Sequence, residues 1–175
     1  MPLLERVGLL WNLHDALLDN QQSNMQKPPD NLIQLWDNPD PFVVPIQVEQ
    51  RHIDELGHTN NVHYLDWLLT CTWQHSTAVG LPPDAMLATG CAMAVRDVRM
   101  QYLSATFAGD QLWVGDWLSH NDGRLRATRH FQILREADEA CVMRADIDYI
   151  CINVGSGRPQ RMPDVFVDAY RVESS

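Results

Sequence analysis

The sequence predicts an α+β domain in which an antiparallel sheet wraps around one long central helix, with an extra helical segment at the N-terminus. Residues 60–80 form a single long, mostly apolar helical segment. Strand-length segments precede and follow it, and several alternate apolar and polar residues. The long helix has no second helical layer to pack on, so the economical way to bury it is to curve the sheet around it.

The first 41 residues are predicted to be an appendage to a domain that spans residues 42–175. Residues 1–20 are expected to form an amphipathic helix, because leucine and valine recur there at helical spacing between acidic residues. Residues 20–41 are rich in Asn, Gln, Pro and Asp, which predicts a linker with one short turn around Leu32–Trp36. The sequence leaves open whether the appendage packs on the domain or mediates assembly.

The domain is expected to begin with a strand, a loop and the long helix. Residues 42–50 alternate in their second half and predict the strand, and residues 51–59 predict the loop. Gly80 supplies a stop for the helix. This helix is apolar over most of its circumference, and such a helix is usually buried on more than one side.

The rest of the chain is predicted to be four strands in an antiparallel meander. An Asn-Asp-Gly run at 121–123 is a strong signal for a tight hairpin. With the helix enclosed, this gives the hot-dog arrangement. The four predicted strands cover residues 91–103, 110–120, 125–135 and 140–154.

Charge and composition exclude several classes of function. The formal net charge is -10, and such a surface repels nucleic acid and anionic membranes. No apolar stretch is long enough to span a bilayer, and the first residues lack the pattern of a signal peptide. We therefore expect neither a nucleic-acid partner nor a membrane partner.

Cysteine and histidine spacing gives no sign of a metal or of disulfides. The four cysteines form no C-x-x-C pair and lie among apolar neighbours, which favours free thiols in a reducing, cytoplasmic setting. The histidines show neither an i, i+4 pair on one helical face nor an H-E-x-x-H motif. We expect no metal and no cofactor.

Residues 51–67 hold the candidate chemistry. Backbone N–H groups at a helix start are unpaired, and the positive end of the helix dipole lies behind them. A carbonyl oxygen held there would be stabilised as it becomes an oxyanion. A carboxylate a few residues upstream could face the same carbonyl, which gives the two components that acyl hydrolysis requires. The residues concerned are Asp54, Gly57, His58, Asn60, Asn61 and Tyr64.

Each of these residues also has a structural interpretation. Asp54 alone could simply form a turn, and Asn60 and Asn61 are good helix caps. Tyr64 lies on the apolar stripe, which favours packing, and His58 is balanced between a substrate contact and a bracing hydrogen bond. Because Asp54, Gly57, His58, Asn60, Asn61 and Tyr64 occur together at the spacing of one motif, a catalytic role is favoured over the structural one.

The run D-x-x-G-H-x-N-N-x-x-Y from Asp54 to Tyr64 resembles the signature of the 4-hydroxybenzoyl-CoA thioesterase-like hot-dog enzymes. Its spacing is also similar to a motif of plant acyl-ACP thioesterases. Residues 101–112 and 156–163 resemble later segments of the family, so that the resemblance covers roughly residues 42–165. Plant acyl-ACP enzymes carry an asparagine two residues after the aspartate, where this chain has Leu56, so a mechanism that depends on that amide is not transferred.

The resemblance implies a catalytic set. Asp54 would attack the thioester carbonyl or activate a water, and the N–H of Asn61 would bind the oxyanion. His58 would orient the thioester or the loop. The resemblance and the arginines together imply substrate contacts by Gly57, Asn60, Tyr64, Arg158 and Arg161.

The resemblance also implies a partner and a substrate. Family members are at least dimers, so we expect a homodimer or homotetramer with the active site at the subunit interface. Arginines are the natural partners of CoA phosphates, and the candidates are Arg126, Arg129, Arg158 and Arg161. The expected function is acyl-CoA hydrolysis. A non-catalytic acyl-thioester-binding module, an acyl-ACP thioesterase and a hot-dog dehydratase are the alternatives.

Overall fold

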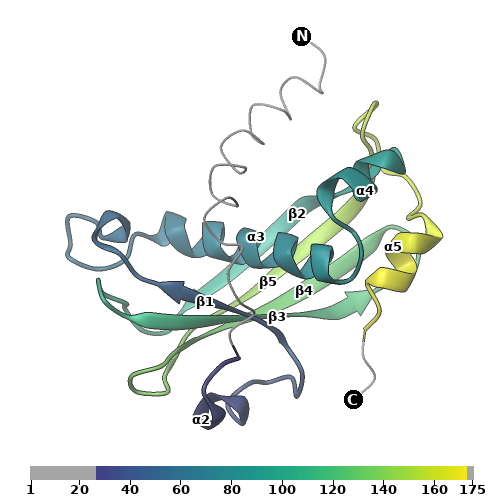
Figure 1. Ribbon diagram of the computed structural model, residues 1–175. Helices are drawn as coiled ribbons and strands as arrows, with labels where there is room; N and C mark the ends of the chain where they lie inside the picture. Colours follow the sequence, from purple (N-terminus) through teal and green to yellow (C-terminus); the bar gives the residue numbers. More distant parts are fainter. Residues whose placement is uncertain (1–26, 173–175) are drawn as a thin grey trace.

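A computed structural model describes residues 27–172, and it confirms the predicted sheet wrapped around one long helix (Figure 1). The predicted helix over residues 1–20 lies outside the described residues. Within residues 27–172, no helix has both the length and the apolar character that crossing a bilayer requires. The strands are β1 (Phe42–Gln47), β2 (Cys91–Tyr102), β3 (Gln111–Asn121), β4 (Arg126–Arg135) and β5 (Cys141–Asn153). The helices are α2 (Asp30–Ile33), the 3-10 turn η1 (Gln50–His52), α3 (Asn61–Ala78), α4 (Pro83–Ala88) and α5 (Asp164–Ala169).

The order of strands differs from the predicted meander. The sheet runs β1-β3-β4-β5-β2, with all neighbours antiparallel. The meander therefore covers only β3, β4 and β5, while β2 pairs with β5 on the far side, as in the pair Cys91↔Asn153. The prediction of a four-strand meander was wrong because alternation locates strands but carries no information on which strands pair. As a result, β2 is an edge strand of the sheet.

Helix α3 buries one face against the concave side of the sheet. Tyr64, Trp67, Leu68 and Cys71 join the largest core cluster, where they pack against side chains of all five strands, among them Phe131. Tyr64, Leu68 and Cys71 lie on the apolar stripe that the sequence shows, whereas Trp67 lies off that stripe and is buried as well. The opposite face, at Asn61 and Val62, remains exposed in a single copy.

The segment that contains α2 packs on the other face of the sheet. Leu32 and Trp36 are buried against Trp113 and Leu134, whose neighbours along each strand point toward α3. Gln132 ties the segment down, because its amide donates to the Leu35 carbonyl at 2.9 Å and its side-chain oxygen accepts from the N–H of Asp37 at 3.0 Å. The described part of the predicted linker is thus attached to the domain.

We predict that Gly115→Ala will destabilise the fold. A Cβ at this position would lie 2.6 Å from Cζ3 of Trp36, so the indole must move from a packed site. We expect a loss of about 1–3 kcal/mol in the free energy of unfolding, measured by urea denaturation. Gly155→Ala is the control, because its nearest contact would be 3.4 Å from Asn153 Oδ1. Equal unfolding midpoints for the two variants would show that the packing of the Trp36 indole does not require a glycine at position 115.

Candidate active site

The Asp54 loop, residues 53–60, is a tight turn closed by its own backbone. Ile53 and Thr59 form a β-bridge across it. Inside the bridge, the Asp54 N–H donates to the His58 carbonyl at 2.9 Å, and the Gly57 N–H donates to the Asp54 carbonyl at 3.0 Å. Gly57 has a φ of +82°, a left-handed conformation that glycine adopts without strain. The turn therefore fixes where the Asp54 side chain leaves the backbone.

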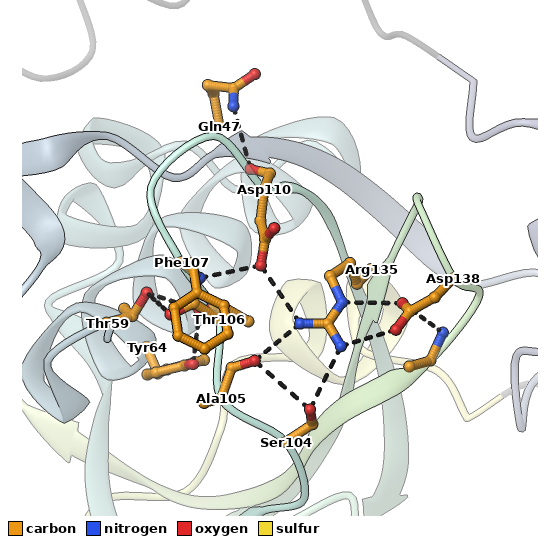
Figure 2. Close-up of polar contacts among 11 residues, drawn as sticks. Gln47, Thr59, Tyr64, Ser104, Ala105, Thr106, Phe107, Asp110, Arg135 and Asp138 are labelled. Atoms are coloured by element: carbon orange, nitrogen blue, oxygen red, sulfur yellow. Dashed lines mark hydrogen bonds and ion pairs between the residues drawn. The ribbon is translucent and has the colours of Figure 1, made fainter. Parts of the chain in front are cut away.

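A cluster of buried hydroxyl groups anchors this loop to α3 and to the β2–β3 connection (Figure 2). Thr106 Oγ1 donates to Thr59 Oγ1 at 2.7 Å, and Thr59 Oγ1 donates to the Thr106 carbonyl at 3.1 Å. Because the Thr106 hydroxyl already donates to Thr59, the Tyr64 hydroxyl is the donor to Thr106 Oγ1, at 2.8 Å. The Thr59 N–H also donates to the Thr106 carbonyl at 2.9 Å. Every hydroxyl in the cluster has a partner, so the three segments are held in one arrangement.

The start of α3 follows directly from this loop. Asn60 is the N-cap, and its Oδ1 accepts from the Val62 N–H at 3.1 Å. The Asn60 N–H in turn donates to the His52 carbonyl at 2.9 Å. Asn61 is the first residue of the helix and is exposed, and its N–H has no acceptor within residues 27–172. A free N–H at the positive end of the helix dipole can accept a ligand oxygen.

Asp54 and His58 bring an accessible carboxylate and an imidazole together beside this helix start. Their side chains are 24% and 39% exposed, and His58 Nδ1 lies 3.6 Å from Asp54 Oδ2. Asp54 Oδ1 accepts from the Leu56 N–H at 2.8 Å, which is the turn-forming contact of an aspartate. Asp54 therefore does form a turn, which is the structural interpretation given to it from the sequence. Its Oδ2 has no hydrogen-bond donor within the described chain apart from the long contact with His58.

The two predicted arginines do not lie with this group in a single copy. Arg158 and Arg161 are exposed and follow the end of β5, where the Asn153 N–H donates to the Arg158 carbonyl at 2.9 Å. That end of β5 pairs with the beginning of β2, whereas Tyr64 contacts Tyr102 at the other end of β2. The Asp54 loop and the segment that follows β5 thus lie at opposite ends of the sheet (Figure 1).

Arg129 is not a surface residue, which corrects its place among the candidates for CoA phosphates. It is buried, with Nη1 2.5 Å from Asp116 Oδ2, because its side chain points from β4 toward α3. Burial acts to lower the pKa of the guanidinium, but the Asp116 carboxylate and other nearby groups outweigh it, so the pKa is raised and Arg129 stays charged. It forms a buried ion pair and is shielded from a surface phosphate.

Two functional contributions were missed at the sequence level. Thr59 and Thr106 brace the site, and the only signal for Thr106 was its place in the family-like segment 101–112. Arg135 also holds that segment in place: it donates to the Ala105 carbonyl at 2.8 Å and pairs with Asp138, also at 2.8 Å (Figure 2). The hydrogen bond to Asp138 is the main cause that raises the pKa of Arg135.

Comparison with known proteins gives both a family match and structural matches. The family model described as "Thioesterase-like superfamily" matches residues 48–170. No curated protein sequence matches this chain.

Three similar solved structures come from bacteria. A 1,4-dihydroxy-2-naphthoyl-CoA thioesterase from Synechocystis is 16% identical, with 75% of this chain and 96% of that chain covered and a TM-score of 0.67. A hypothetical protein from Staphylococcus aureus, in complex with CoA, is 17% identical, with 74% and 81% covered and a TM-score of 0.69. A DHNA-CoA thioesterase from Staphylococcus aureus is 20% identical, with 73% and 87% covered and a TM-score of 0.66. At these identities the likeness is one of fold.

Proposed function

This chain belongs to the thioesterase-like superfamily, and we propose that it hydrolyses an acyl-CoA thioester to a free acid and CoA. One observation carries the proposal: an accessible Asp54 carboxylate is fixed in a turn that leads directly into a helix whose first N–H is free. The family match and the similar thioesterase structures support thioester hydrolysis as the general chemistry. We assign this activity to residues 42–175, with residues 1–41 as an appendage.

The proposed reaction begins with the thioester carbonyl oxygen on the Asn61 N–H. Asp54 Oδ2 either attacks the carbonyl carbon or takes a proton from a water that attacks it. The N–H and the helix dipole stabilise the oxyanion that forms. The C–S bond then breaks and CoA leaves as the thiolate, which becomes the thiol by taking up the proton that the attacking water loses in either route. If Asp54 is the nucleophile, water hydrolyses the resulting mixed anhydride and returns the free carboxylate.

The neighbouring residues are proposed to position the substrate. A Cβ on Gly57 would meet no heavy atom within 4 Å among the described residues, so a thioester has room beside this backbone. His58 is proposed to orient the carbonyl or the Asp54 carboxylate, which lies 3.6 Å from its imidazole. Asn60 and Tyr64 would act through the helix start, since one caps it and the other is buried beneath it.

We further propose that the active molecule is a homodimer or a homotetramer, with the site at the subunit interface. The edge strand β2 and the exposed side of α3 offer the surface for it. Large exposed hydrophobic side chains gather around them, and such patches mark interaction surfaces. Those at β2, the β2–β3 connection, the Asp54 loop and the start of α3 are Leu56, Val62, Val95, Tyr102, Leu103 and Phe107.

Oligomerisation also bears on CoA binding. A second copy related by a two-fold axis through β2 would bring its Arg158 and Arg161 toward the Asp54 loop of the first, because such an axis exchanges the ends of the sheet. We propose these arginines as partners of the CoA phosphates. A reducing, cytoplasmic setting fits the proposal, because all four cysteines lie in the described chain and are free.

Asp54→Asn is expected to lower turnover by about a hundredfold or more, because the amide can neither attack the carbonyl nor accept a proton from water. Thiol release from a panel of acyl-CoA thioesters would measure it. Glu55→Gln is the matched control, since Glu55 is the adjacent exposed carboxylate. Equal activity of the Asp54 variant and the wild type would reject the mechanism. Saturable acyl-CoA binding without thiol release by the wild type would support a binding module instead.

His58→Ala is expected to cost less, about ten- to a thousandfold in kcat if the imidazole helps to polarise the carbonyl. The same thiol-release assay measures the loss, and circular dichroism checks that the loop variant remains folded. An unchanged kcat would reduce His58 to a bracing residue of the turn.

Val95→Asp is expected to produce a monomer with little turnover, because it puts a charge on the edge strand that the proposed interface buries. Sedimentation velocity reports the oligomeric state. Ile33→Asp is the matched control, since Ile33 is 44% exposed against 45% for Val95 but lies in α2 on the other face of the sheet. If the Val95 variant sediments as the wild type does, the interface lies elsewhere.

A further inference from the structure

A cavity of about 200 Å³ lies between the second half of α3 and strands β2, β4 and β5. Its partly exposed lining is apolar and includes Leu69, Met93 and Val95. Its deeply buried lining holds a polar group, which we call the polar end: Thr72, Ser76, Arg129, Tyr149 and Tyr170. A cavity of about 150 Å³ suffices for a benzene ring, so this one has room for a small organic group.

The polar end retains hydrogen-bonding capacity that the described chain does not use. A guanidinium has five N–H donors. Arg129 uses Nη1 toward Asp116 and His75, at 2.5 and 2.9 Å, and Nη2 toward Ser76, at 3.2 Å. Its Nε has no acceptor within residues 27–172. A ligand oxygen in the cavity can therefore accept from Arg129.

Tyr149 supplies the complementary acceptor. The Thr72 hydroxyl donates to the Leu68 carbonyl at 3.0 Å, so at the 3.2 Å contact between Thr72 and Tyr149 the tyrosine is the donor. Burial raises the pKa of Tyr149 to about 12, against the opposing effect of its hydrogen bond to Thr72, so the phenol stays protonated. Its oxygen keeps lone pairs that can accept from a ligand hydroxyl.

Charge decides against an anionic ligand. Asp116 is fully buried and already neutralises Arg129. The pair leaves no net positive charge for a ligand anion, and Asp116 Oδ1, which has no hydrogen-bond partner among the described residues, adds an unsatisfied acceptor beside Arg129. A ligand carboxylate would compete with Asp116 for the same guanidinium. A neutral hydroxyl, which both donates and accepts, matches Tyr149 and Arg129 together.

The position of the cavity connects it to the proposed active site. Thr72 follows Asn61 by eleven residues of α3, or about 17 Å at 1.5 Å per residue, so the cavity is remote from Asp54 of the same chain. Met93 and Val95 border it from the first half of β2, while Tyr102 marks the end near the Asp54 loop. A two-fold axis through β2 would place this cavity beside the Asp54 loop of a second copy.

We infer that this cavity is the specificity pocket of the proposed thioesterase, and that it favours acyl groups that carry a neutral hydroxyl at the end remote from the thioester. The inference rests on the proposed function. Arg129 and Tyr149 are the specificity-determining residues, and the apolar walls hold the rest of the acyl group.

The test compares kcat/KM for acyl-CoA thioesters matched in skeleton, one ring-sized set and one straight-chain set, which end in a hydrogen, a hydroxyl or a carboxylate. In at least one set the wild type should prefer the hydroxyl over both others by about tenfold or more. Tyr149→Phe should lower that preference at least about fivefold, because it removes the oxygen that accepts from the ligand hydroxyl. Arg129→Lys, which keeps a charge for Asp116 but loses Nε, should do the same.

Tyr102→Phe is the matched control, because it removes a tyrosine hydroxyl outside the cavity and should leave the preference intact. Equal hydrolysis of the three thioesters in both sets, or an equal loss on all of them in the Tyr149 variant, would overturn the inference and leave the proposed function standing. A preference for the carboxylate would overturn it as well. Hydrolysis of none would overturn both.

Discussion

Three buried hydroxyl groups, those of Thr59, Tyr64 and Thr106, hydrogen bond to one another where the Asp54 loop, α3 and the β2–β3 connection meet. The direction in which the first N–H of α3 points depends on this junction, since the loop before the helix has no other buried side-chain tie to the sheet among the described hydrogen bonds. A buried hydroxyl without a partner costs about 1–3 kcal/mol, so the three groups are stable only as a set. Catalytic geometry at the helix start would thus be enforced by the fold and not by the flexible side chains of the site.

The other end of α3 is organised by a buried ion pair. Asp116 and Arg129 bring two charges into a buried region, where Arg129 also contacts His75 and Ser76 of α3 beside an apolar core cluster. A buried pair is often no more stabilising than well-packed hydrophobic residues of the same size. Its presence is therefore better explained by what it offers to a ligand than by stability alone. Arg129 lines a cavity and keeps an unused donor, which is consistent with that explanation.

The parts that sequence predicted well are the local ones. The Asp54-to-Tyr64 run specified a turn, a cap and a helix start because each depends on residues within a few positions of one another. Strand order failed because the partner of β2 lies far away along the chain, as the pairing of Cys91 with Asn153 illustrates, and alternation carries no information on such pairing. Arg129 was misplaced for a related reason. Its exposure depends on which face of β4 points toward α3, and a charged side chain on the inner face breaks the pattern that identifies that face.

In a single copy, the proposed catalytic groups and the cavity lie at opposite ends of α3. The accessible carboxylate and the free N–H lie at its start, and the cavity that could hold an acyl group lies about 17 Å further on, with Trp67 and Leu68 buried between them. Strand β2 runs alongside both and has one unpaired edge. Antiparallel pairing of that edge with its own copy is self-complementary, so it reverses the direction of the second α3 relative to the first. In the proposed dimer the start of one helix would then face the end of the other, and the Asp54 carboxylate of one chain would act on an acyl group held in the cavity of its partner.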